Sequence, residues 1–174
     1  MIPCVCLLCA LFTTEVRLST ADGSVRTNEV ALARLADGTL RFKMPAVEVQ
    51  EASRCLEVIP SFMTARSGEP GFWVLPDGRY GTFRDVEGVC DYGQHPRRTL
   101  MPIHGIKTQR GAFLAIVRGM RHDCDFLAKA EGGEYSLSTF FRLGELNGKA
   151  PYEDFMIDYI PRARVSSATL ACSR

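Results

Sequence analysis

The sequence predicts a single all-β domain, an antiparallel sandwich built from hairpins. Its 174 residues fall within the usual size of one domain with its own hydrophobic core. Turn dipeptides recur at short intervals between runs rich in β-branched and aromatic residues. No run of ten or more residues has strong helical periodicity, so a parallel sheet with crossover helices is disfavoured.

Two Asp-Gly dipeptides, at 22–23 and 37–38, predict the first two hairpins, because glycine tolerates the positive φ of a type I′ turn. The predicted strand pairs are 15–19 with 24–30, and 30–35 with 39–44. In the last of these segments Leu40 and Phe42 alternate with Arg41 and Lys43. Period-two alternation predicts a strand with one face buried and one in water.

The next segment is less regular. Residues 45–54 are predicted to be extended or briefly helical, since their apolar positions are only loosely spaced. Residues 56–63 resume a strand that Pro60 interrupts, and because proline cannot donate to a sheet ladder we expect an edge or a bulge there.

The second half of the chain predicts three more hairpins and a closing strand. The first hairpin spans 71–83 and turns at Pro76-Asp77-Gly78. The second pairs 100–107 with 112–120 across a turn at 108–111. The third pairs 126–130 with 135–143 across a turn at 131–134. Residues 84–99 are predicted as a polar loop, and 154–160 as the last strand. We expect Trp73 inside, together with Phe72, Phe83, Phe113 and Phe126, because large aromatics remove most apolar area from water.

This pattern divides the chain into three parts: residues 1–14, a sandwich at 15–161 and a tail at 162–174. The first part is an apolar run too short to cross a bilayer as a helix, so no transmembrane segment is predicted. The run fits either a signal peptide or a first strand, although no basic residue precedes it. A secreted or periplasmic location and a cytoplasmic one therefore both stay open.

Cysteine usage does not predict a metal centre or a dense disulfide framework. Cys4, Cys6 and Cys9 alternate with aliphatic residues in the apolar run and are interpreted as packing groups. The other four cysteines are Cys55, Cys90, Cys124 and Cys172. They are too widely spaced for a zinc ribbon, and they could form two disulfides or none.

Charge argues against a polyanionic partner. There are 21 Lys and Arg against 20 Asp and Glu, a net charge of +1, and the basic residues are scattered. Nucleic-acid binding is therefore not predicted. No phosphate-binding glycine loop, serine-hydrolase elbow or zincin helix is present in the sequence, and no cofactor is predicted.

Candidate catalytic residues are few. Sugar chemistry commonly uses a histidine with a carboxylate, or two carboxylates, as acid and base. The candidates for these roles are Asp85, Glu87, Asp91, His95 and His104. The alternative interpretations are a solvated loop for the first four and, for His104, a partly buried histidine hydrogen-bonded to the backbone. His122 and Cys124 alternate along one segment and are candidates for a metal site that would need further ligands from elsewhere.

Four segments together resemble the amino-terminal β-sandwich of large bacterial glycoside-hydrolase-like proteins, which is similar to galactose mutarotase. The segments are Gly71–Gly78, Pro102–Ile106, Gly111–Met120 and Asp154–Tyr159, within about half of the chain. The resemblance implies a supersandwich fold and a carbohydrate-associated, non-catalytic module, accessory to a glycoside hydrolase and partnered by a catalytic barrel domain or chain. Only 14 residues follow Ile160, whereas a barrel typically needs about 250, so no barrel is expected here.

If the module binds carbohydrate, exposed aromatic rings would supply the stacking surface. The candidates are Trp73, Tyr80, Tyr92 and Tyr135. Two alternatives stay open: a small epimerase or hydrolase that uses a His and carboxylate pair, and a structural or protein-interaction module.

Overall fold

The structure is a computed structural model, and it describes residues 12–49, 53–74, 80–83, 88–91, 102–146 and 149–162. Strands dominate these residues, and the helical elements among them are two short 3₁₀ turns. The elements are β1 (Thr13–Thr20), β2 (Val25–Ala31), β3 (Ala33–Arg34), β4 (Leu40–Met44), η1 (Ala46–Glu48), β5 (Ser53–Pro60), β6 (Thr64–Arg66), β7 (Phe72–Val74), β8 (Tyr80–Thr82), β9 (Gly88–Asp91), β10 (Ile103–Lys107), β11 (Ala112–Gly119), β12 (Cys124–Glu131), β13 (Glu134–Arg142), η3 (Leu143–Leu146) and β14 (Phe155–Arg162).

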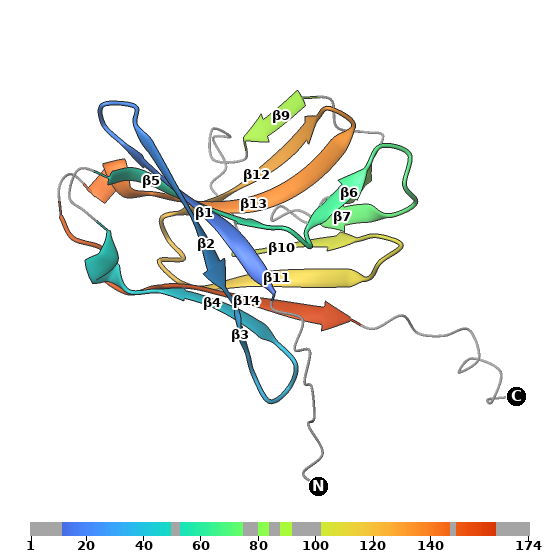
Figure 1. Cartoon of the computed structure of the whole chain (residues 1–174), viewed down its shortest axis with the longest axis horizontal. Coiled ribbons are helices and arrows are strands. Elements are labelled where there is room, and N and C mark those ends of the chain that lie inside the picture. Colours follow the sequence, from blue (N-terminus) through green and yellow to red (C-terminus); the bar gives the residue numbers. More distant parts are fainter. Residues whose placement is uncertain are drawn as a thin grey trace, which may run out of the picture.

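Two antiparallel sheets of seven strands each face one another (Figure 1). Sheet A runs in the order β2-β1-β5-β13-β12-β9, with β6 also paired to β13. Sheet B runs in the order β3-β4-β14-β11-β10-β7-β8. The predicted antiparallel β-sandwich is therefore confirmed.

The predicted hairpins form with the expected partners. β1 pairs with β2, β3 with β4, β7 with β8, β10 with β11, and β12 with β13. Gly23 and Gly38 have φ of 83° and 86°, the conformation that made their dipeptides turn signals. The two strands of each of these hairpins thus lie side by side in space.

Two details differ from the prediction. The segment 84–99 was expected to be a loop, but it contains β9, which pairs with β12. Pro60 was expected at an edge or a bulge, yet β5 lies inside sheet A between β1 and β13, so the edge alternative is wrong. Pro60 ends β5, and the chain turns through 61–63. β6 then pairs with β13 at Ser136, three positions from Thr139, the nearest residue of β13 that pairs with β5.

The core fills the space between the sheets. Its fully covered side chains come from both, among them Phe42, Leu56, Phe126, Phe141 and Tyr159. Alternation explains the selection, because every second residue of a strand faces the opposite sheet.

The aromatic predictions for this core are largely met. Trp73 is buried, and its ring lies 6.0 Å from that of Phe83 and 6.2 Å from that of Tyr135. Phe126 is buried as expected. Phe72 is exposed, because it alternates with Trp73 on β7 and points to the outer face.

Candidate functional site

His104, the candidate base on β10, lies sealed in the core. Its side chain is 0% exposed, its ring is 4.6 Å from that of Phe126, and its Nε2 lies 2.9 Å from Oγ1 of Thr139 on the opposite sheet. The hydrogen bond goes to a side-chain hydroxyl and not to the backbone as expected. A substrate cannot reach this ring while the sandwich is folded.

Burial also fixes the protonation state of His104. Loss of water around the ring lowers its pKa to about 3, since a buried imidazolium has no solvent to stabilise its charge. Nδ1 has no hydrogen-bond partner among the residues that the structure describes. The ring is thus neutral near pH 7 and ties the two sheets together.

Of the other acid and base candidates, Asp91 alone lies within the described residues, and there by its backbone. His95, Asp85 and Glu87 lie outside the described residues, as does Tyr92. The structure places the backbone of Asp91 at the end of β9, where it pairs with Leu127 of β12. β9 belongs to sheet A and His104 to sheet B.

Two of the four aromatic stacking candidates, Trp73 and Tyr135, present little exposed ring surface. Trp73 is 4% exposed and Tyr135 is 9% exposed, and both pack against Phe83. Tyr80 is placed by its backbone in β8, opposite Val74. The burial of Trp73 and Tyr135 argues against their use as a platform for sugar rings.

His122 and Cys124, the metal candidates, point apart. His122 is exposed on the turn after Met120, whereas Cys124 is buried at the start of β12 and its thiol donates to the carbonyl oxygen of Arg121 at 3.2 Å. Burial raises the pKa of the Cys124 thiol to about 12, which disfavours the thiolate that a metal needs. Across the described part of the chain, no group of three or more His, Cys, Asp or Glu side chains gathers as a metal site would require.

A different feature stands out on the solvent face of sheet A. A hollow of about 240 Å³, here called the polar depression, opens over β1, β5, β12 and β13. Its lining residues are Arg17, Glu57, Ile59, Lys129, Glu131, Glu134 and Ser136. These side chains point away from the core, whereas the residues between them along each strand point into it.

Strand register explains how these polar groups meet. Arg17 lies opposite Glu57 in the β1 and β5 pair, and Lys129 lies opposite Ser136 in the β12 and β13 pair. Glu57 accepts a hydrogen bond of 2.7 Å from the hydroxyl of Ser138 and lies 3.5 Å from Nζ of Lys129. Side chains far apart in sequence thus form one continuous polar surface.

The hairpin end of the depression carries two carboxylates that face each other. Glu131 and Glu134 are directly opposite in the β12 and β13 register, and both are exposed. Like charges in this position repel. Gly132 and Gly133, with φ of 60° and 80°, hold them on either side of a two-residue turn. Hydrogen-bond donors from a ligand would relieve the repulsion.

Sequence analysis did not single out these residues. The available signal was the period-two alternation of charged and apolar residues in 13–20, 53–60 and 124–136, which marks an outward polar face on each strand. It could not show which outward residues become neighbours, because the strand order of sheet A is not the order of the sequence.

Comparison with models of known protein families, with curated protein sequences and with solved structures finds no match to this chain. Within the described residues, no helix has the length and apolar character that crossing a bilayer requires.

Proposed function

We propose that this sandwich is a non-catalytic, carbohydrate-associated binding module, accessory to a glycoside hydrolase, that holds a saccharide in the polar depression. The supporting observation is the composition of that hollow. Two cations, three carboxylates and a serine hydroxyl surround one apolar side chain, Ile59.

This composition suits a polyol. Each sugar hydroxyl both donates and accepts hydrogen bonds, so it needs acceptors and donors within one small area. Glu131 and Glu134 supply acceptors, Arg17 and Lys129 supply donors, and Ile59 offers contact to the C–H face of a ring. The hollow is smaller than the roughly 300–1,000 Å³ of most small-molecule pockets, which favours a single sugar residue over a long oligosaccharide.

The alternative of a small sugar-processing enzyme has less support. Of its candidate residues, His104 has a described side chain, and that side chain is enclosed by the core. A catalytic acid or base must come within hydrogen-bond reach of the substrate. The burial of His104 therefore favours a binding role over proton transfer at this position.

The proposal is tested by titrating the ¹⁵N-labelled protein with a panel of neutral monosaccharides and disaccharides. We expect amide shifts concentrated in β5, β12 and β13, and an affinity loss of about tenfold in Glu134→Gln, because each charge-assisted hydrogen bond contributes on that scale. Glu48→Gln, an exposed carboxylate on η1, is the matched control and should bind as the unsubstituted chain does.

Two results would contradict the proposal. One is the absence of shifts with every sugar at millimolar concentration. The other is binding that Glu134→Gln and Lys129→Gln leave unchanged, which would move the sugar away from the polar depression.

A further inference from the structure

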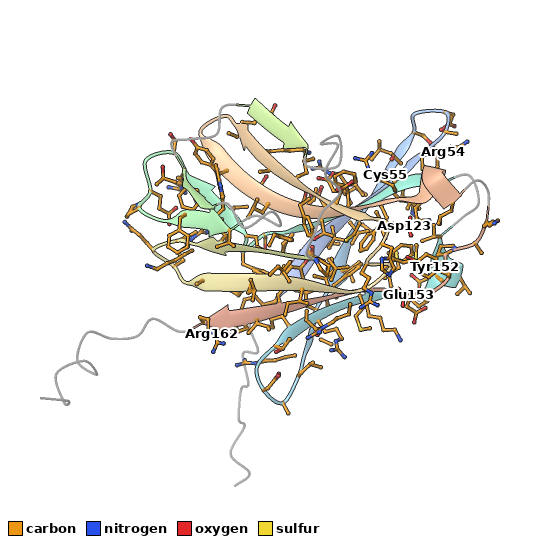
Figure 2. All side chains as sticks on the ribbon, turned by 180° about the vertical axis from the view of Figure 1, so that it is seen from behind. Arg54, Cys55, Asp123, Tyr152, Glu153 and Arg162 are labelled. Carbon is orange, nitrogen blue, oxygen red and sulfur yellow. The ribbon has the colours of Figure 1, made fainter. Side chains whose placement is uncertain are left out.

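A larger groove lies at one end of the sandwich. It is bounded by η1, the start of β5, η3 and the segment 149–151, and it encloses about 380 Å³. We call it the end groove. It is lined by Ala46, Val47, Val49, Ser53, Arg54, Leu143, Leu146, Lys149, Ala150 and Pro151. Figure 2 shows Arg54 at the same end of the molecule as Asp123 and Tyr152, whereas Arg162 lies toward the other end.

The walls of the end groove are mostly apolar. Val49, Leu143 and Leu146 line it, and Val47 at η1 is 92% exposed. Covering an aliphatic side chain with that exposure by an apolar group is favourable, because it removes apolar surface from water. The volume lies within the lower part of the range of about 300–1,000 Å³ that small-molecule sites occupy.

The η1 wall is held in place by Asp154. One carboxylate oxygen accepts a hydrogen bond of 3.1 Å from the backbone N–H of Ala46, and the other lies 3.0 Å from Nζ of Lys43. Both contacts lower the pKa of Asp154, so the carboxylate is ionised near neutral pH. The groove is therefore formed by anchored elements on at least this side.

Two cations line the same groove, and no carboxylate is among its described lining residues. Arg54 and Lys149 are exposed, and neither makes an ion pair in the described part of the chain. The arginines Arg41, Arg118 and Arg142 each bind an aspartate on the sheet faces. Arg54 extends instead across Gly144 of η3, with its Cδ 3.4 Å from the position a Cβ would take there.

A third polar group in the wall has no hydrogen-bond partner among the residues that the structure describes. Ser53 is 4% exposed, and its buried Oγ makes no hydrogen bond within the described residues. Leaving a buried hydroxyl unpaired is unfavourable, and such groups are rare in folded proteins. A ligand oxygen in the groove would supply the missing acceptor.

We propose that the end groove binds a small amphiphilic carboxylate, such as a medium-chain fatty acid. The carboxylate interacts with Arg54 and Lys149, the hydroxyl of Ser53 donates to a ligand oxygen, and the alkyl chain covers Val49, Leu143 and Leu146. Charge, an unpaired donor and an apolar wall all occur in one cavity, and together they match this ligand class. The site is separate from the polar depression and does not depend on saccharide binding.

Isothermal titration with three probes separates the contributions of head and tail. Octanoate carries both, octan-1-ol has the tail without the charge, and acetate has the charge without the tail. We expect octanoate to bind at least tenfold more tightly than either of the others, and Arg54→Gln to lower its affinity about tenfold. Arg34→Gln, an exposed arginine on β3, is the matched control and should bind octanoate normally.

Ser53→Ala provides a second readout. Without ligand, the variant should melt at a higher temperature than the unsubstituted chain, because an unpaired buried hydroxyl is removed. It should nevertheless bind octanoate several-fold more weakly and show a smaller rise in melting temperature at saturating octanoate. A substitution that only damaged the fold would lower the melting temperature.

The proposal is overturned if octanoate fails to bind at millimolar concentration, or if octan-1-ol binds as tightly as octanoate. It is equally overturned if Arg54→Gln and Ser53→Ala both bind octanoate as the unsubstituted chain does.

Discussion

Replacing His104 by glutamine should remove most of the mild-acid sensitivity of this fold. The ring is fully enclosed and burial lowers its pKa to about 3, whereas a histidine in an unfolded chain titrates near 6.5. Between these two values the unfolded state binds more protons than the folded state. Stability therefore falls as pH is lowered through that window.

The size of the effect follows from the same two pKa values. Proton linkage gives a loss of about 2–3 kcal/mol in the free energy of unfolding between about pH 7.5 and about pH 4.5. The carboxylates whose folded pKa is lowered, such as Asp158, contribute stability that is present above their unfolded pKa of 3.8 and is lost only as pH falls further. The chosen window thus isolates histidine.

Urea unfolding followed by tryptophan fluorescence measures this difference, because Trp73 is the single tryptophan and is buried. His104→Gln is compared with the unsubstituted chain at both pH values, each against its own stability near pH 7.5. The exposed His122→Gln is the control and should retain the full loss. If His104→Gln also loses about 2–3 kcal/mol over this range, the assignment of acid sensitivity to the buried ring is refuted.

Three further substitutions or reactions test the packing. Gly119→Ala should destabilise the fold by more than about 2 kcal/mol in urea unfolding, because its Cβ would overlap the carbonyl oxygen of Asp154, whereas Gly144→Ala meets only ordinary contacts and should cost little. Cys124, with its buried thiol of raised pKa, should not react with a thiol reagent at about pH 8 until the protein unfolds. Asp158→Asn should cost about 1–3 kcal/mol, because its 6% exposed carboxylate binds two arginines.

Each of these tests has a contrary outcome. Equal unfolding midpoints for the two glycine variants would show that the contact at β11 is not tight. Rapid labelling of Cys124 in the native protein would mean that the start of β12 opens readily. For Asp158→Asn the control is Glu15→Gln, an exposed partner of Arg17 that should change stability by less than about 0.5 kcal/mol, and similar losses in both would remove the special role of Asp158.

Local features of the sequence were sufficient to predict the hairpins and most of the strands. The Asp-Gly pairs at 22–23 and 37–38 and the alternation of Leu40, Arg41, Phe42 and Lys43 depend on backbone geometry within a few residues, so they can be recognised without the fold. β9 was missed because its four residues, Gly88–Asp91, belong to a segment without such alternation and pair with β12 about 40 positions away.

The sites depended on contacts that no local pattern contains. The polar depression needs β1, β5, β13 and β12 side by side, an order that the sequence does not follow. The end groove joins η1 to η3, about 100 residues apart.

The sequence by itself determined the class of this protein, an all-β chain of hairpins, because turn chemistry and two-residue periodicity act over short distances. Tertiary structure decided which polar residues are buried and which are accessible. His104 and Arg54 both belong to β-strands, yet the packing of two sheets encloses one and leaves the other at an open groove. Burial is a property of the elements that come together around a residue, so it appears only once the sheets have packed.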